Sequence, residues 1–280
     1  MSTLITGGTG NVGLPLLEAL GGRSGVRALA LTDDDAVKIR ERDVEPVRGS
    51  LADPGSLPAA FAGVDRLFLL TPFVEGQEQL EHAALDAAEK SGVEHVVKFA
   101  YAGLDWPIDL TAGHRRIRDR LDDAPYAVTL LLADVFATNL LGQADLLRDG
   151  TLVLPGPEAR IAYVDPLDVG QVAAALLTST DPGTGRVVVT GPELLSNELT
   201  ADIAGRAYTG SPAAYVAAGA QPFAESLISG GWPPFVAHAV AEMHTTIAEQ
   251  GPLPVSDTTP TLLGRPATSL SAFFTRVLPS

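Results

Sequence analysis

Cysteine is absent from the 280 residues of this sequence. Its absence excludes disulfide bonds, thiolate catalysis, and any zinc or iron–sulfur site that needs cysteine ligands. Basic side chains are also few, since 19 Lys and Arg stand against 34 Asp and Glu, which gives a formal net charge of −15. A chain of this charge repels a polyanion, so we expect no nucleic-acid partner.

Long apolar runs are missing as well. The longest, such as AVTLLLADVFA, are interrupted and fall short of the roughly 20 apolar residues that a membrane span requires. The start of the chain has no charged segment followed by the apolar core of a secretory signal, because TLIT leads directly into glycines. We therefore expect a cytoplasmic protein that does not interact with a membrane.

Several catalytic signatures do not occur. The five histidines have no spacing typical of metal ligands, and neither the G-x-S-x-G turn of hydrolases nor the H-E-x-x-H helix of metalloproteases is found. We expect no metal site.

Short apolar runs alternate with helical patterns along the first half of the chain. The runs TLIT, VRALALT, RLFLLT, HVVKFAYA and AVTLLLA predict strands that are buried on both faces. The segments VGLPLLEAL, DPGSLPAAFAG, EGQEQLEHAALDAAEKSG and HRRIRDRLDDA lie between them and predict helices. This alternation predicts an α/β fold with a doubly wound parallel sheet. We predict a core over residues 1–150 and a smaller, mostly helical part over residues 151–280 that interleaves with it.

The clearest predicted helix lies in EGQEQLEHAALDAAEKSG. Leu80, Ala84, Leu85 and Ala88 have helical spacing, polar residues occupy the other positions, and Gly92 marks the C-terminal end.

A glycine motif opens the chain in TGGTGNVG, between a predicted strand and a predicted helix. Gly7 would turn the chain, Gly10 would let the backbone approach a pyrophosphate, and Gly13 would let the helix pack closely on the strand. A glycine turn without any ligand is the alternative. Because the strand, the motif and the helix come in the right order, we predict a dinucleotide site. Its residues are Thr6, Gly7, Gly8, Thr9, Gly10, Asn11, Val12 and Gly13.

Asp33 follows the last motif glycine by 20 residues and comes at the end of the second predicted strand. A carboxylate at this place can bind the ribose hydroxyls of NAD. The run TDDD can equally cap the following helix and supply its acidic first turn. Both interpretations can hold together.

Several segments in order resemble the NmrA-like family of atypical short-chain dehydrogenases, which includes NAD(P)H:quinone oxidoreductases and isoflavone-reductase-type enzymes. They are LITGGTGNVG, VEPVRGSLADPGSL, VDRLFLLTP, SGVEHVVKFA, NLLGQADLLRDG, YVDPLDV, VTGPELLS and LLGRPATSLSAFF. The resemblance covers nearly the whole chain. It implies a Rossmann core that holds NAD(P), with a C-terminal part that closes over a small, often aromatic or quinonoid substrate.

The chain lacks the Tyr followed four positions later by Lys that ordinary short-chain dehydrogenases use, and the NmrA-like group lacks this pair as well. The chain also departs from its relatives. Relatives that prefer NADP carry an arginine where this chain has Leu31 and Thr32, and Ser50 stands where relatives place an Asp near the adenine. We expect NAD(P) as cofactor with a preference for NAD, because the acidic run from Asp33 would repel a 2′-phosphate.

The candidates for catalysis are His114, Lys98 and Tyr101. The resemblance implies that His114 falls where quinone-reductase relatives have a histidine, and it is the best acid or base candidate, although it could also face water. Lys98 ends a predicted strand and would hold a cofactor ribose or polarise a carbonyl, or else be a solvated lysine. Tyr101 could bind a substrate oxygen or simply pack.

Four further candidates come from the same comparison of segments. Thr71 and Pro72 would lie beside the cofactor ribose, although a strand-end turn also explains them. Asn139 and Tyr163 match family positions on the substrate side, although Asn139 could equally cap a helix or pack.

The function that these residues favour is an NAD(P)-dependent oxidoreductase that reduces a small apolar carbonyl or quinone. Two alternatives remain from the sequence: a dinucleotide-binding redox sensor without turnover, and an enzyme of specialised metabolism that uses the fold for non-redox chemistry. We expect the substrate to be a small molecule, and we expect the protein to be a monomer or a homodimer.

Overall fold

The computed structural model describes residues 1–181 and 183–279, which divide into two compact units. The first unit takes residues 1–100, 113–132 and 166–187, and the second takes residues 101–112, 133–165 and 188–280. Each unit therefore combines residues from before and after position 150.

A seven-stranded sheet forms the centre of the first unit, with the strand order β3-β2-β1-β4-β5-β6-β9. The pairings of β1 with β2 and β4, of β2 with β3, and of β4 with β5 are all parallel. The strands are β1 (Thr3–Ile5), β2 (Val26–Ala30), β3 (Glu45–Arg48), β4 (Arg66–Leu69), β5 (His95–Tyr101), β6 (Ala127–Ala133) and β9 (Gly185–Val189). The predicted doubly wound parallel sheet is confirmed.

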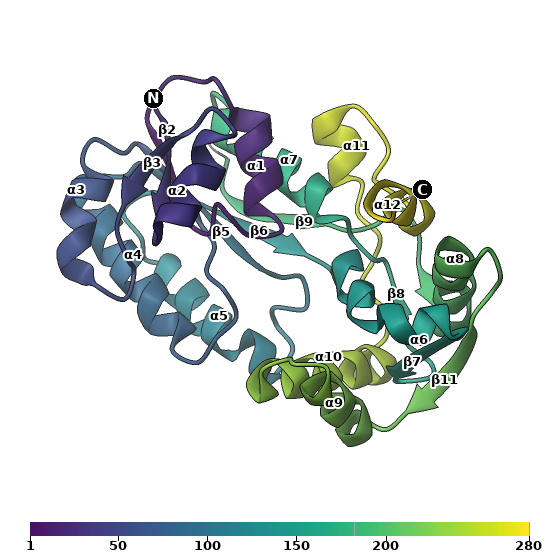
Figure 1. Ribbon diagram of the computed structural model, residues 1–280. Helices are drawn as coiled ribbons and strands as arrows, with labels where there is room; N and C mark the ends of the chain where they lie inside the picture. The colour runs from purple at the N-terminus through teal and green to yellow at the C-terminus, as the bar shows by residue number, and fades with distance from the viewer. Residues whose placement is uncertain (182, 280) are drawn as a thin grey trace. The chain divides into compact units, whose positions relative to one another are not determined.

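Helices cover both faces of this sheet (Figure 1). On one face lie α1 (Gly13–Leu20), α2 (Asp33–Arg40) and α7 (Pro166–Thr178), and on the other lie α3 (Leu57–Phe61), α4 (Gln77–Ser91) and α5 (Asp109–Leu121). A short 3₁₀ turn, η1 (Pro54–Ser56), precedes α3. Two helices on the same face, α1 and α7, pack closely because Gly170 lets α7 approach the backbone of α1 at Val12 and Leu16.

The structure corrects two local predictions. Strand β3 was not among the predicted strands, because its proline and its partly exposed residues hide the apolar pattern of a strand. The fourth predicted helix was expected to begin at His114, but α5 begins at Asp109, so His114 lies in its second turn.

The second unit contains short strands and most of the C-terminal helices. Its strands pair as β7 (Thr151–Pro155) with β11 (Ala214–Ala218), in parallel, and β8 (Arg160–Ile161) with β10 (Leu195–Ser196), antiparallel. Its helices are η2 (Ala137–Gln143), α6 (Ala144–Arg148), α8 (Asn197–Thr209), α9 (Ala220–Ser229), α10 (Pro234–Gln250), α11 (Thr258–Leu263) and α12 (Leu270–Val277). One apolar cluster that includes Phe223, Met243 and Phe274 forms its core.

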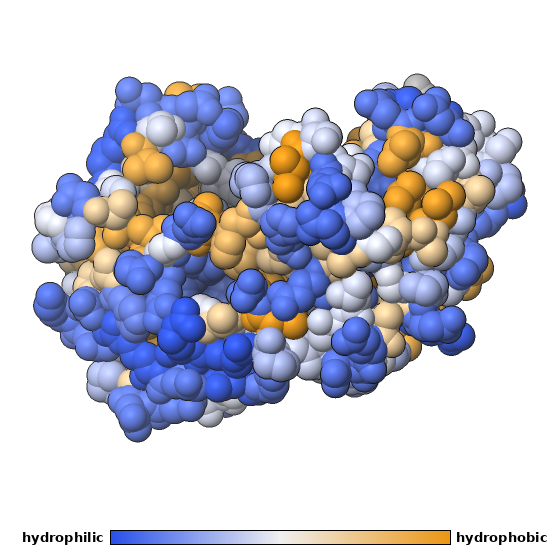
Figure 2. Space-filling model, turned by 90° about the horizontal axis from the view of Figure 1, so that it is seen from below, coloured by the Kyte–Doolittle hydropathy of each residue, from blue (hydrophilic) through white to orange (hydrophobic). Residues whose placement is uncertain are grey.

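Hydrophilic side chains cover most of the face shown in Figure 2, and hydrophobic side chains appear in patches among them. In the part of the chain that the structure describes, no helix combines the length and the hydropathy that crossing a bilayer demands. Over the same residues, no group of three or more His, Asp or Glu side chains is arranged to hold a metal ion.

Candidate functional site

The glycine motif forms a tight loop between β1 and α1. Gly7 has a positive φ of 65°, and a side chain on it would meet the Leu70 carbonyl oxygen at 2.8 Å. A side chain on Gly13 would come within 2.1 Å of the Gly7 carbonyl oxygen. The Thr6 hydroxyl fixes the loop to the residue after β4, donating to the Leu70 carbonyl at 2.8 Å and accepting from its N–H at 2.9 Å. The protein's own packing therefore requires glycine at positions 7 and 13.

Gly10 is different, because nothing in the protein requires a glycine there. It is exposed, and a side chain on it would contact only the Gly7 carbonyl oxygen, at 3.4 Å. No side chain caps the N-terminus of α1, which starts just after the exposed Asn11 and the buried Val12. An exposed glycine before an uncapped helix N-terminus lets a phosphate approach the free N–H groups of the helix. The loop thus fits the phosphates of a dinucleotide.

The acidic run after β2 caps α2, as one of the two sequence interpretations expected. Thr32 is the N-cap and forms a capping box with Asp35, whose carboxylate also accepts a hydrogen bond of 2.9 Å from the Thr9 hydroxyl. These hydrogen bonds lower the pKa of Asp35 despite the opposing effect of its partial burial. The glycine loop and the start of α2 are therefore joined through one carboxylate.

Asp33 has a cationic partner from a neighbouring strand. The register of β2 and β3 pairs Ala30 with Arg48, and the Arg48 guanidinium donates to the Leu31 carbonyl at 3.0 Å and forms an ion pair with Asp33. Both side chains are largely exposed. Ser50, two residues beyond Arg48, is occupied in a local turn, where its N–H donates to the Ser56 hydroxyl at 2.9 Å.

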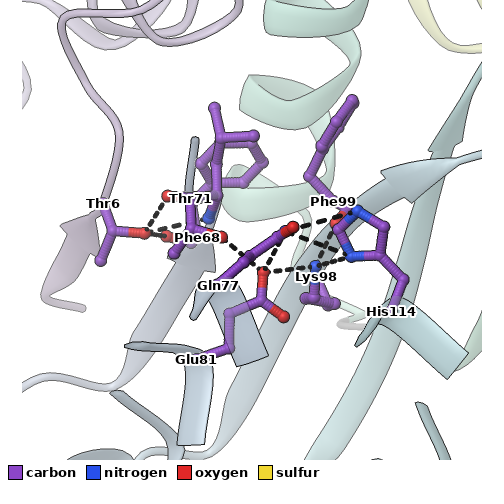
Figure 3. A network of polar contacts seen from close by, with 9 residues as sticks. Thr6, Phe68, Thr71, Gln77, Glu81, Lys98, Phe99 and His114 are labelled. Atoms are coloured by element: carbon purple, nitrogen blue, oxygen red, sulfur yellow. Dashed lines mark hydrogen bonds and ion pairs between the residues drawn. The ribbon is translucent and has the colours of Figure 1, made fainter. Parts of the chain in front are cut away.

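A buried polar network lies where β4 and β5 end (Figure 3). Glu81 on α4 is fully buried, and its Oε1 atom accepts hydrogen bonds from Thr71 at 2.7 Å and Gln77 at 3.1 Å. The same oxygen forms an ion pair of 2.9 Å with the Lys98 ammonium of β5. Lys98 also contacts Nδ1 of His114 on α5 at 3.1 Å. Two helices, strand β5 and the segment after β4 thus bring five polar side chains together.

Lys98 does not have the environment of a solvated strand-end lysine, because it is 1% exposed. Its three ammonium hydrogens have three acceptors in the network, namely Glu81, His114 and the Phe99 carbonyl. Burial lowers the pKa of Lys98, and the Glu81 carboxylate opposes this effect. In this arrangement no hydrogen of Lys98 is left for a cofactor ribose or a substrate carbonyl, so the roles expected from the sequence are not open to it directly.

His114 does not face water, since only 8% of it is exposed. Burial and then the neighbouring Lys98 charge lower its pKa well below the usual value. The ring is therefore neutral around pH 7. Pro72 is exposed in the segment after β4, next to the buried Thr71.

The other candidates belong to the second unit. Tyr101 is 7% exposed, packs edge-on against Trp106 with ring centroids 6.0 Å apart, and has a pKa raised well above 10.0 by burial and by Asp134. Tyr163 is buried in the apolar cluster of the same unit. Asn139 is half-buried in η2. The structure thus brings Lys98, His114 and Thr71 together in the first unit, while these three candidates lie in the second.

Three residues were missed by the sequence interpretation. Gln77 and Glu81 were counted among the polar positions of α4, although the spacing 77, 81, 84, 85 and 88 places both on its buried face. A carboxylate in line with the apolar residues at 84, 85 and 88 was the signal that could have identified Glu81. Asp134 is also buried, and it follows directly after β6.

The model of the NmrA-like family matches residues 2–262. An NAD(P)H azoreductase from Xenophilus azovorans is 30% identical over 275 residues and covers 96% of both chains. A (4-alkanoyl-5-oxo-2,5-dihydrofuran-3-yl)methyl phosphate reductase from Streptomyces griseus is 32% identical over 273 residues, with 94% of this chain and 93% of the relative covered. The crystal structure of an NADPH-dependent quinone oxidoreductase from Escherichia coli, in complex with NADPH, has a TM-score of 0.90 at 22% identity and covers 98% of this chain and 99% of its own.

Proposed function

This chain belongs to the NmrA-like family, and we propose that it is an NAD(P)-dependent reductase of a small apolar carbonyl or quinone. The observation that carries the proposal is the glycine loop, in which Gly10 is exposed and not required by packing, whereas Gly7 and Gly13 are. The names of the relatives support it, since two of them are reductases that use NAD(P)H or reduce a carbonyl-containing ring.

In the proposed reaction, the reduced dinucleotide supplies a hydride when it is bound. Gly10 and the uncapped N-terminus of α1 would hold its phosphates, Gly7 and Gly13 would keep the loop tight, and Thr9 would keep the loop fixed to α2. His114 would donate the proton that the substrate oxygen needs. In the second unit, Tyr101, Asn139 and Tyr163 would bind the substrate.

The cofactor preference needs a separate argument. The sequence favours NAD, because Leu31 and Thr32 provide no cation. However, Arg48 lies at the Leu31 carbonyl and balances the charge of Asp33. Lys38 likewise pairs with Asp34 at 2.6 Å. The repulsion expected against a 2′-phosphate is therefore mostly compensated, and we propose that NADPH is accepted as well as NADH, with Arg48 as the cation for its 2′-phosphate.

Calorimetric titration with NADH and NADPH tests both parts. Arg48→Gln should weaken NADPH binding by about tenfold and leave NADH binding nearly unchanged, since a charge-assisted hydrogen bond at an exposed site contributes about 1.4 kcal/mol. Arg40→Gln, at an exposed position on α2, is the control. An equal loss for both dinucleotides would contradict the role of Arg48 in selecting the 2′-phosphate.

Turnover is tested with 1,4-naphthoquinone by following NADPH oxidation. His114→Gln should lower kcat by about 100-fold, because a positioned general acid typically contributes about two to four powers of ten. Binding of either dinucleotide without oxidation in any quinone or carbonyl assay would favour the sensor. No binding of either dinucleotide would contradict the proposed function.

A further inference from the structure

The contact between Lys98 and His114 fixes where the imidazole carries its hydrogen. Lys98 Nζ lies 3.1 Å from Nδ1 of His114. An ammonium group can only donate, so this contact is favourable only if Nδ1 presents a lone pair. A neutral imidazole has one hydrogen, which must then be on Nε2.

The other neighbour of the ring leaves that hydrogen unused. Gln77 Nε2 lies 3.4 Å from Nε2 of His114 and donates to Glu81 at 3.1 Å, so it is the amino end of the amide that faces the ring. Two donors at this distance do not form a hydrogen bond. The Nε2–H of His114 therefore remains for an oxygen from outside this network.

Lys98 is held as a charged group by Glu81 and is at the same time buried. Oε1 of Glu81 accepts hydrogen bonds from Thr71 and Gln77 and forms an ion pair with Lys98. These contacts hold the carboxylate beside the ammonium. Because burial lowers the pKa of Lys98, this ammonium releases a proton more readily than an exposed lysine does. A buried lysine that contacts an imidazole nitrogen can resupply the imidazole with a proton.

We propose that His114 acts as an acid through its Nε2–H, and that Lys98 resupplies it through Nδ1 while Glu81 positions Lys98. The inference rests on the proposed function, because the accepting oxygen must belong to a carbonyl or quinone that gains a hydride in the same reaction. The Nε2–H bond breaks and an O–H bond forms on the substrate, while the electron pair of the broken bond stays on Nε2. In the same step Nδ1 takes a proton from Lys98, which leaves a neutral amine. After the product leaves, Nε2 takes a proton from water and Nδ1 returns its proton to Lys98, so both groups recover their starting state.

Few charged groups face His114. Lys98 approaches it from β5 and Glu81 faces it from α4 through Lys98. Glu78 and Arg116, on the two helices α4 and α5, pair with each other at 2.6 Å on the surface. The pKa of His114 is therefore lowered by its burial and by the charge of Lys98, which Glu81 holds in place.

Nitrogen-15 NMR of the histidine rings in the protein without dinucleotide tests the hydrogen position directly. For His114 we expect the neutral form with its hydrogen on Nε2 across the neutral pH range, and His114→Gln assigns the signal. Lys98→Met should raise the pKa of His114 and populate the form with its hydrogen on Nδ1, because the donor to Nδ1 and the nearby positive charge are both lost. An imidazolium or an Nδ1–H ring in the unchanged protein at about pH 7 would overturn the proposal.

Lys98→Arg separates resupply from positioning, because a guanidinium keeps the charge and the hydrogen bond but does not release a proton. We expect the Nε2–H form of His114 to be retained in this variant while kcat for naphthoquinone falls by about 100-fold. Lys90→Arg, at an exposed position of α4, is the matched control and should leave kcat unchanged. An unchanged kcat in Lys98→Arg with the Nε2–H form retained would overturn the role of Lys98.

Glu81→Gln keeps the test decisive if the arginine variant does not fold. Removing the carboxylate lowers the pKa of Lys98 further, so the alkaline limb of the kcat profile should move to lower pH by about one unit or more. A role of Glu81 in packing alone would lower kcat without moving this limb, and that result would overturn its positioning role. Dinucleotide titration of the same variants shows separately whether the proposed function holds.

Discussion

Replacing Asp134 with asparagine should change how the stability of this protein depends on pH. Asp134 is 4% exposed, and its carboxylate accepts a hydrogen bond of 2.8 Å from the Val135 N–H. Burial raises its pKa from 3.8 to about 7, although the hydrogen bonds from the Val135 and Ala162 backbone act in the opposite direction. Asparagine keeps an oxygen acceptor of nearly the same shape at this position and does not titrate.

The magnitude follows from the difference between the folded and unfolded pKa values. A shift of about three units corresponds to about 4 kcal/mol, at about 1.4 kcal/mol per unit. The folded protein keeps a proton that the unfolded chain has lost, so stability falls as pH rises from about 4 to about 7. From about pH 5 to about pH 8, the titration of Asp134 should lower the unfolding free energy of the protein by about 3 kcal/mol. The Asp134→Asn variant should not show this loss, because asparagine does not titrate.

Urea unfolding at these two pH values measures the effect. The unfolding free energy of Asp134→Asn minus that of the unchanged protein should be about 3 kcal/mol larger at the higher pH than at the lower pH. Asp123→Asn, at an exposed position, is the control and should show no such shift. If Asp134→Asn and the unchanged protein lose stability in parallel as pH rises, the carboxyl group is not held protonated by its burial, and the reasoning is wrong.

Three further substitutions test the loop and the second unit. Gly10→Val should leave the unfolding free energy within about 0.5 kcal/mol of its original value, because the new side chain has room in the protein. It should weaken dinucleotide binding by about two powers of ten, because the side chain would occupy the place of the pyrophosphate. An unchanged calorimetric affinity would contradict the site. Gly13→Ala should lower the unfolding free energy by about 3 kcal/mol or more in urea titrations, since its side chain would lie 2.1 Å from the Gly7 carbonyl oxygen; normal stability would show that the loop relaxes. His244, whose pKa burial lowers to about 4, should cost the protein stability as pH falls from about 6.5 to about 4, and His244→Phe should reduce the loss of melting temperature over this range. Equal losses in both proteins would show that His244 does not cause the acid sensitivity.

The elements predicted well from the sequence are those set by local patterns. Strands β1 and β5 are short apolar runs, and α4 ends at Gly92, which adopts the left-handed conformation with φ 73° that favours glycine. The glycine loop could be recognised because a strand, three spaced glycines and a helix follow one another directly in the chain. In each of these cases the residues that decide the structure are close neighbours in sequence.

The contacts that could not be predicted join segments that are far apart in the sequence. Arg48 reaches Asp33 only because β3 lies beside β2 in the sheet, and a sequence search for a cation next to Leu31 does not find it. Glu81 reaches Lys98 only because α4 packs on β4, the strand beside β5 in the sheet. The solvation of Lys98 and His114 could not be inferred either, because their burial depends on how helices cover the sheet edge.

The interleaving of the first unit determines how the chain can be divided. The strand β9, at one edge of the sheet beside β6, and the helix α7, which packs on α1, both come from residues beyond 165. A fragment that ends at residue 150 would leave the β6 edge unpaired and the α7-facing side of α1 exposed to water. During synthesis, the first unit therefore cannot complete its own packing until β9 has left the ribosome, although its glycine loop is made more than 170 residues earlier.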